Sequence, residues 1–273
     1  MTARTALFAC LLAGSALLAS GAPAQTAARV DQGALRAAVA VPTRTAANVA
    51  RDRYRHPVET LAFFGVRPSD TVVEIWPGGG WYSEILAPYL AKGGGTYIGA
   101  ASERGLTGLR KLVAAQPAGY AGVRTANFPI LPTAAGTPVA PGSADVVLTF
   151  RNVHNWMMGD TPFERQAFAQ MYAMLKPGGT LGVVEHRLPE AANAAREKKS
   201  GYVKVSTVRR LAEAAGFRLV AASEINANRR DTKDYAEGVW TLPPTYTLKD
   251  KDRARYAAIG ESDRMTLKFV KPK

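Results

Sequence analysis

The stretch that decides the fold runs from Val72 to Leu86 and reads VVEIWPGGGWYSEIL. Its first residues belong to an apolar run from Thr71 to Ile75. Such a run is typical of a strand buried on both faces of a parallel sheet. The turn Pro77 to Gly80 then leads into a helical stretch from Trp81 to Ala91. Glycines in such a turn let a ligand approach the backbone, and the amides at the helix start favour anionic groups. The alternative is a tight strand-to-helix turn that holds no ligand.

The same alternation of strands and helices continues along the chain. Further strands are predicted at 95–100, 122–126, 145–150, 180–184 and 217–222, and helices at 57–64, 106–115, 162–175 and 207–215. Strands alternating with helices of this length indicate a Rossmann-like, doubly wound α/β fold with a mostly parallel sheet. Residues 265–270 alternate as an antiparallel last strand would. Ligands of such sheets bind at the carboxyl ends of the strands.

Several common site motifs are missing from the sequence. A dinucleotide-binding fingerprint would need a third glycine where Ser83 stands and an acidic residue roughly 20 residues beyond the turn. The sequence contains no Walker A, H-E-x-x-H or G-x-S-x-G pattern. The NTPase, zinc-protease and serine-hydrolase classes therefore have no local support.

The amino end has the pattern of a secretory signal peptide. An apolar run from Ala6 to Ala19 is followed by Ala22-Pro23-Ala24, an A-x-A cleavage site. The run is shorter than the roughly 20 residues that a spanning helix needs, although an uncleaved anchor is the alternative. We expect residues 1–24 to be removed, and the mature protein to be periplasmic or secreted without a membrane span. Cys10, the one cysteine, would leave with this leader, which excludes disulfides and a cysteine nucleophile from the mature chain.

Composition bounds the rest of the chain. Residues 25–44 are alanine-rich with little periodicity, so we expect a flexible segment or a loose helix there, ahead of one domain over 45–273. The formal net charge is +13, and it can attract anionic partners. No helix-turn-helix, RNP or zinc-finger pattern occurs, and an exported protein rarely meets nucleic acid. We therefore expect no nucleic-acid partner.

Three segments resemble the motifs of one enzyme family. They are VVEIWPGGGWYSEIL at Val72 to Leu86, SADVVLTFRNVHNW at Ser143 to Trp156 and LKPGGTLGVVEHR at Leu175 to Arg187. In this order they resemble motif I, the fourth-strand motif and the later LKPGG segment of the class I S-adenosylmethionine-dependent methyltransferases. The chain is most similar to a group of predicted exported methyltransferases of proteobacteria. The resemblance implies the fold of that class and S-adenosylmethionine as the cofactor.

The resemblance also implies which residues hold the cofactor. It assigns Glu74, Gly78 and Gly80 as contacts. It further implies that the backbone near Trp76 and Gly79 lines the methionine end of the ligand.

Two positions depart from the family pattern. Trp76 stands where the family has its first glycine, and Ala100-Ala101-Ser102 stands where it has an acidic residue for the ribose hydroxyls. Glu103 lies close enough to replace that acid. The alternative is a solvent-facing glutamate at a helix start.

Two histidines follow strands at the predicted ligand edge. His154 comes after the fourth strand and His186 after the fifth. Imidazole suits a general base that takes a proton from an acceptor hydroxyl or nitrogen, so His154 is the first candidate and His186 the second. The alternative for His154 is a loop histidine that hydrogen-bonds backbone. A metal ion on both histidines and Glu185 is chemically allowed, but we predict none, because no single element supplies the ligand spacing.

An arginine-rich segment precedes the first predicted helix of the domain. Arg51, Arg53 and Arg55 alternate ahead of His56 and could clamp an anionic substrate. The favoured alternative is a solvated charged segment.

The predicted function is S-adenosylmethionine-dependent methyl transfer to a small-molecule acceptor that the sequence does not name. The alternative is an exported ligand-binding protein with a methyltransferase-like fold and no catalysis.

Overall fold

The structure is a computed structural model that describes residues 1–2, 30–130 and 136–273. Its strands form one eight-stranded sheet in the order β3-β2-β1-β4-β5-β8-β7, and β6 pairs with β5. The strands are β1 (Thr71–Ile75), β2 (Thr96–Ala100), β3 (Arg124–Ala126), β4 (Ala144–Phe150), β5 (Leu175–Leu188), β6 (Val203–Lys204), β7 (Arg218–Ser223) and β8 (Arg264–Val270). β1 to β6 pair in parallel, whereas β8 lies antiparallel between β5 and β7. The predicted Rossmann-like, mostly parallel sheet with an antiparallel last strand is confirmed.

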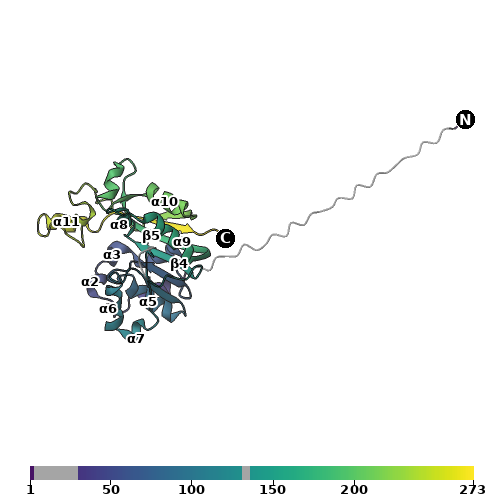
Figure 1. The fold of residues 1–273 in the computed structure, drawn as a ribbon, viewed down its shortest axis with the longest axis horizontal. Helices are drawn as coiled ribbons and strands as arrows, with labels where there is room; N and C mark the ends of the chain where they lie inside the picture. The colour runs from purple at the N-terminus through teal and green to yellow at the C-terminus, as the bar shows by residue number, and fades with distance from the viewer. Residues whose placement is uncertain (3–29, 131–135) are drawn as a thin grey trace.

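Helices cover both faces of this sheet. Apolar clusters join α1, α4, α5 and α6 to one face and α8, α9 and α10 to the other. In Figure 1, β4 and β5 lie between α5 and α10. The helices are α1 (Gln32–Val39), α2 (Ala46–Val49), α3 (Asp52–Arg55), α4 (Pro57–Phe64), α5 (Ser83–Lys92), α6 (Thr107–Ala115), α7 (Pro117–Tyr120), α8 (Val153–Met157), α9 (Glu164–Met174), α10 (Val205–Ala214) and α11 (Arg253–Ile259), with the 3-10 turns η1 (Ala194–Lys198) and η2 (Gly238–Thr241).

The position of β1 explains the apolar run that predicted it. β1 lies between β2 and β4, and Val72, Val73 and Ile75 are fully buried. β7, in contrast, lies at the sheet edge and alternates exposed with half-buried residues. Because parallel strands end at one edge, the residues that follow β1, β2 and β4 lie near one another.

The amino-terminal segment contains a packed helix. α1 lies against α4 and α5, with Leu35 fully buried and Ala38 nearly so. Composition alone indicated a flexible segment or a loose helix here. Two apolar residues three positions apart were enough to anchor one face of this short helix.

Two local expectations near the site need correction. β5 is longer than expected and continues through His186, so this histidine lies on the strand rather than after it. His154 lies in the short helix α8 rather than in a loop. Antiparallel pairing with β8 explains why β5 extends past Val184, because the ladder continues to His186.

The predicted leader lies almost wholly outside the described residues. The structure does not describe residues 3–29, so a signal peptide over 1–24 stays a prediction. Over the ranges that it does describe, no helix combines the length and the apolar character needed to cross a membrane.

Candidate active site

The turn after β1 has a backbone shape that glycine adopts at least cost. Trp76, Gly78 and Gly80 have φ angles of 51°, 58° and 84°. This left-handed region costs a bulky residue such as tryptophan about 1–3 kcal/mol. A Cβ atom on Gly78 or Gly79 would meet no atom within 4 Å, whereas one on Gly80 would lie 2.9 Å from Leu112 Cδ2. Gly78 and Gly79 therefore face open space, and Gly80 faces α6.

Three cavities adjoin along this edge of the sheet. The turn cavity, of about 460 Å³, is lined by Trp76, Gly78, Gly79, Ser102, Arg104, Gly105 and Gly108. The arginine cavity, of about 240 Å³, shares Trp76, Gly78 and Gly79 with it, and its wall includes Arg51, Arg55, Trp81, Arg151 and Asn152. The histidine cavity, of about 180 Å³, shares Arg151 with the arginine cavity, and its wall includes His154, His186, Trp240, Glu261 and Ser262. Because neighbouring cavities share wall residues, they lie side by side, and we call the three together the groove.

Glu74 lies beneath the turn. Its carboxylate is buried, and Oε2 accepts hydrogen bonds from the Tyr97 hydroxyl at 2.6 Å and the Ser83 hydroxyl at 3.1 Å. Burial raises the pKa of Glu74 to about 7, although these two hydrogen bonds act in the opposite direction. Glu74 is not among the described residues that line the three cavities. Direct contact between Glu74 and a cofactor thus stays a prediction.

The side chain of Trp76 is anchored beside the groove. Its indole N–H donates to the carbonyl of Phe128 at 3.1 Å, and its ring packs edge-on against Trp156 with centroids 6.1 Å apart. Trp156 itself is fully buried. The indole of Trp76 is therefore held in place by the core beside the turn.

Glu103 lies at the rim of the turn cavity. Its exposed carboxylate accepts hydrogen bonds from Arg110 at 2.8 Å and Asn127 at 3.1 Å. The hydrogen bond from Arg110 is the main cause that lowers the pKa of Glu103. Its neighbours Ser102 and Arg104 line the cavity. A role for Glu103 at a ribose stays a prediction.

Glu185 orients His154. The Nδ1 atom of His154 lies 2.9 Å from Glu185 Oε1, and the backbone N–H groups of His154 and His186 also donate to this carboxylate. Such a carboxylate favours a proton on Nδ1, which leaves Nε2 of His154 as a proton acceptor. His154 is 3% exposed and lines the histidine cavity. A carboxylate that holds the imidazole of a general base has this arrangement.

Ser262 holds His186, the second candidate base. The Nδ1 atom of His186 lies 2.5 Å from the Ser262 hydroxyl, and the rings of the two histidines are 5.2 Å apart. Burial, reinforced by His154 and Arg151, lowers the pKa of His186 well below its usual value. His186 is therefore neutral at physiological pH.

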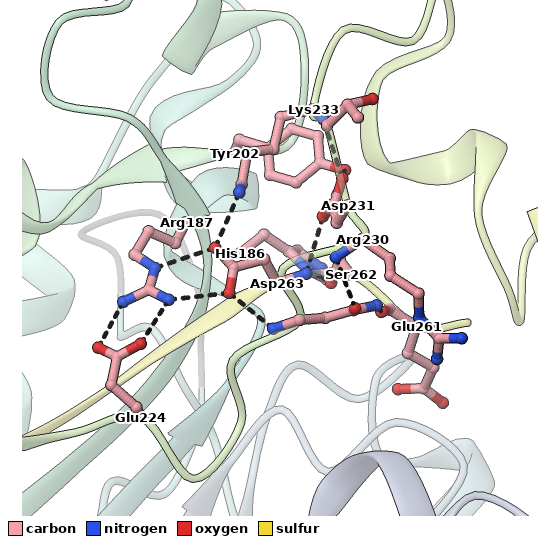
Figure 2. A network of polar contacts seen from close by, with 12 residues as sticks. His186, Arg187, Tyr202, Glu224, Arg230, Asp231, Lys233, Glu261, Ser262 and Asp263 are labelled. Carbon is pink, nitrogen blue, oxygen red and sulfur yellow. Dashed lines mark hydrogen bonds and ion pairs between the residues drawn. The ribbon is translucent and has the colours of Figure 1, made fainter. Parts of the chain in front are cut away.

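A polar network fixes the segment that carries Ser262 (Figure 2). The adjacent Asp263 accepts hydrogen bonds from the guanidinium of Arg187 and donates its backbone N–H to Asp231 at 2.7 Å. Asp231 in turn accepts a hydrogen bond from the hydroxyl of Tyr202 at 3.1 Å. The position of Ser262 against His186 is thus set by buried or half-buried ionic contacts.

The histidine pair could also supply metal ligands. Donor atoms of His154, Glu185 and His186 lie within 4.8 Å of one another. Two observations oppose a cation there. The carboxylate already receives hydrogen bonds from both histidines, and Arg151 and Arg55 lie near enough to lower the pKa of His186. A positive local field disfavours a divalent ion.

The structure brings the two histidines and the glycine turn onto one groove. Sequence reasoning missed two residues of this groove, Arg151 and Ser262. Arg151 follows β4 directly, but nothing in the sequence marks its left-handed φ of 62°. Ser262 is nearly 80 residues from His186 in the chain, and only the pairing of β5 with β8 brings them together.

The arginine segment has a mixed environment. Arg51 and Arg55 line the arginine cavity, and Arg55 is 2% exposed. Arg53 instead is exposed and lies over the ring of Tyr54, 4.7 Å from its centroid. The favoured interpretation as a solvated segment is wrong for Arg51 and Arg55, and right for Arg53.

Comparison with known proteins supports the fold. No protein-family model and no curated protein matches the chain. Among solved structures, the chain is similar to a SAM-dependent methyltransferase from Aquifex aeolicus, with 14% identity, a TM-score of 0.53, and coverage of 88% of this chain and 98% of that one. It is also similar to the [4+2]-cyclase SpnF, with 14% identity, a TM-score of 0.56 and coverage of 85% of each chain. At this identity the likenesses show a common fold.

Proposed function

We propose that the protein transfers a methyl group from S-adenosylmethionine to a small-molecule acceptor. The observation that carries the proposal is the row of three adjoining cavities, in which the open glycine turn lies at one end and His154, oriented by Glu185, at the other. The fold of the Aquifex aeolicus methyltransferase adds support.

The turn residues fit the proposed cofactor. Gly78 and Gly79 leave open space where a side chain would stand, and both line the turn cavity and the arginine cavity. When bound there, S-adenosylmethionine would supply an electrophilic methyl group on its sulfonium sulfur. Gly78, Gly79 and Ser102 would hold it through backbone contacts and through one hydroxyl.

His154 and Glu185 supply the acid–base function. The free Nε2 of His154 accepts the proton that an acceptor hydroxyl or nitrogen loses as it is methylated. Glu185 keeps Nδ1 protonated and stabilises the resulting imidazolium. Asn152 connects the segment that carries His154 to the turn after β1, because its side-chain amide donates to the carbonyl of Ile75 at 2.9 Å.

The experiment that tests the proposal is a calorimetric titration with S-adenosylmethionine. The parent should bind, and Gly79→Val should weaken binding by about tenfold or more, since its side chain would enter the groove. Gly79 is the sharper position because it lacks the positive φ of Gly78 and Gly80, so the backbone tolerates a side chain. Gly122→Val is the matched control: Gly122 is exposed, and its Cβ position is also open.

Equal binding by the parent and Gly79→Val would place the cofactor elsewhere and refute the proposal. The alternative, a non-catalytic binding protein on this fold, predicts binding without formation of S-adenosylhomocysteine with any acceptor. The similarity to a cyclase illustrates that this fold does not impose one chemistry.

A further inference from the structure

Four arginines surround a single carboxylate between the turn and the histidines. Glu261 accepts from Arg51 Nε at 2.6 Å, from Arg55 Nε at 3.1 Å and from Arg264 Nη1 at 3.0 Å. Arg151, the fourth, lines the arginine cavity with Arg51 and Arg55, and the histidine cavity with Glu261. Arg55 ends α3, and Arg51 directly precedes that helix. Arg151 directly follows β4, and Arg264 begins β8.

The positive charge of this cluster is not balanced by the part of the chain that the structure describes. Within that part, Glu261 is the only ion-pair partner of the cluster, and Arg151 has none. Nη2 of Arg51, Nη2 of Arg55 and Nε of Arg264 are buried without an acceptor. Burial is the main cause that lowers the pKa of Arg55 to about 9, followed by the nearby charge of Arg151. Uncompensated buried charge is costly, so such a cluster is built for an anion.

Arg151 is the arginine placed to touch a ligand in the histidine cavity. It is the only arginine among the described residues that line this cavity. Its left-handed φ of 62° is strained, and its backbone N–H is fixed to the carbonyl of Val184 at 2.7 Å. Arg151 lines both the arginine cavity and the histidine cavity, and it shares the wall of the latter with His154.

We propose that this cluster recognises an anionic group, a carboxylate or a phosphate, on the acceptor molecule. Arg151 donates to the anion, while Arg51 and Arg55 supply the surrounding positive field. That the anion belongs to a methyl acceptor rests on the proposed function. The anion site itself is argued from the arginine cluster alone. The guanidinium of Arg151 can bind two oxygens at once, which orients the acceptor with its reacting atom toward His154.

The first test measures anion binding by the mature protein without cofactor. Inorganic phosphate and benzoate should each bind in calorimetry, and benzyl alcohol, the neutral relative of benzoate, should not. Absence of binding by both anions would overturn the proposal. Binding of benzyl alcohol as tight as that of benzoate would also overturn it, because an apolar pocket would then explain the affinity.

The second test uses Arg151→Asn, since asparagine tolerates a left-handed φ. Loss of charge-assisted hydrogen bonds should weaken phosphate and benzoate binding roughly 10- to 100-fold. Arg53→Asn is the control and should bind both anions like the parent, because Arg53 lies outside the three cavities. Unchanged anion binding by a folded Arg151→Asn protein would overturn the proposal.

A titration of Arg151→Asn with S-adenosylmethionine distinguishes the two sources of a carboxylate. Retained cofactor binding together with lost phosphate binding supports an acceptor site. Lost cofactor binding assigns Arg151 to the carboxylate of the cofactor and overturns the acceptor assignment. If the parent binds phosphate and benzoate but not S-adenosylmethionine, the proposed function fails and the anion site remains.

Discussion

At the residue scale, a buried carboxylate decides what His154 can do. The carboxylate of Glu185 is hydrogen-bonded to Nδ1 of His154 and to two backbone N–H groups. One ring nitrogen of His154 is therefore occupied by this hydrogen bond, and Nε2 remains for a ligand in the histidine cavity. Glu74, another buried carboxylate near this edge of the sheet, contacts Tyr97 and Ser83 and connects β1 to α5. The two acids therefore differ in role: one prepares a base, and the other holds the turn.

His154→Ala should lower turnover by about 10² to 10⁴, because it removes the proton acceptor. Turnover is measured as formation of S-adenosylhomocysteine with an acceptor found by screening. Affinity for S-adenosylmethionine should change little, since the cofactor is held by the turn. His56→Asn is the control, because His56 lies outside the three cavities. Asparagine is chosen there because it tolerates the left-handed φ of 41° at that position. Full turnover by His154→Ala would transfer the role of base to another group, with His186 next.

Glu74→Gln should stabilise the protein more at pH 8 than at pH 5. Burial raises the pKa of Glu74 from 4.5 to about 7 in the folded state, so between these values the folded chain keeps a proton that the unfolded chain releases. Stability from this residue is therefore lost as the pH rises from 4.5 to 7, by a few kcal/mol at most. Glutamine stays neutral and can still accept from Tyr97 and Ser83. Thermal unfolding of both proteins at the two pH values checks this, and equal differences in Tm would contradict it.

The residue scale is where sequence reasoning reached least far. Gly78, Gly79 and His154 could be found because turn glycines and a histidine just past a strand have simple positional meaning. Glu74 was assigned from the family resemblance, and Glu103 as a replacement for the acid that the family has after its second strand. The carboxylates of both residues accept hydrogen bonds from neighbouring side chains, and neither residue lines one of the three cavities. The direction in which a side chain points depends on tertiary partners, such as Tyr97 and Arg110, that no local pattern reveals.

At the element scale, the strands were predictable and the amino-terminal helix was not. β1 and β4 are buried on both faces, so their apolar runs marked them almost to the residue. Three of the eight residues of α1 are alanine, and only Leu35 and Ala38 of this helix are buried. The extra length of β5 depended on β8, a strand that is distant in sequence.

Leu35→Ala should lower the free energy of unfolding by about 2–4 kcal/mol, because Leu35 is fully buried between α1 and the body of the domain. Chemical denaturation of the parent and the variant measures the change. Arg36→Ala, on the exposed face of α1, should shift stability by less than about 0.5 kcal/mol. Similar small effects of both substitutions would show that α1 contributes little to the folded domain.

At the scale of the whole molecule, the sheet order gathers residues from the entire chain at one edge. The turn after β1, the segment after β2, the end of β4 and the β5–β8 pair each contribute a wall of the groove. Alternation of strands and helices was enough to predict this architecture, because parallel strands with crossovers allow few topologies. The arginine cluster was not predictable, since Arg55, Arg151, Glu261 and Arg264 meet only in the folded chain.

The measurement that tests the central claim most directly is a crystal structure of the protein with S-adenosylhomocysteine. We expect the ligand to bind against Gly78 and Gly79 in the turn cavity, with the histidine cavity and the guanidinium of Arg151 left open for an acceptor. Density for the ligand in this position would establish the groove as the cofactor site that the proposed methyl transfer requires. A ligand bound away from Gly78 and Gly79, or a crystal soaked at saturating concentration with no ligand in the groove, would contradict the account.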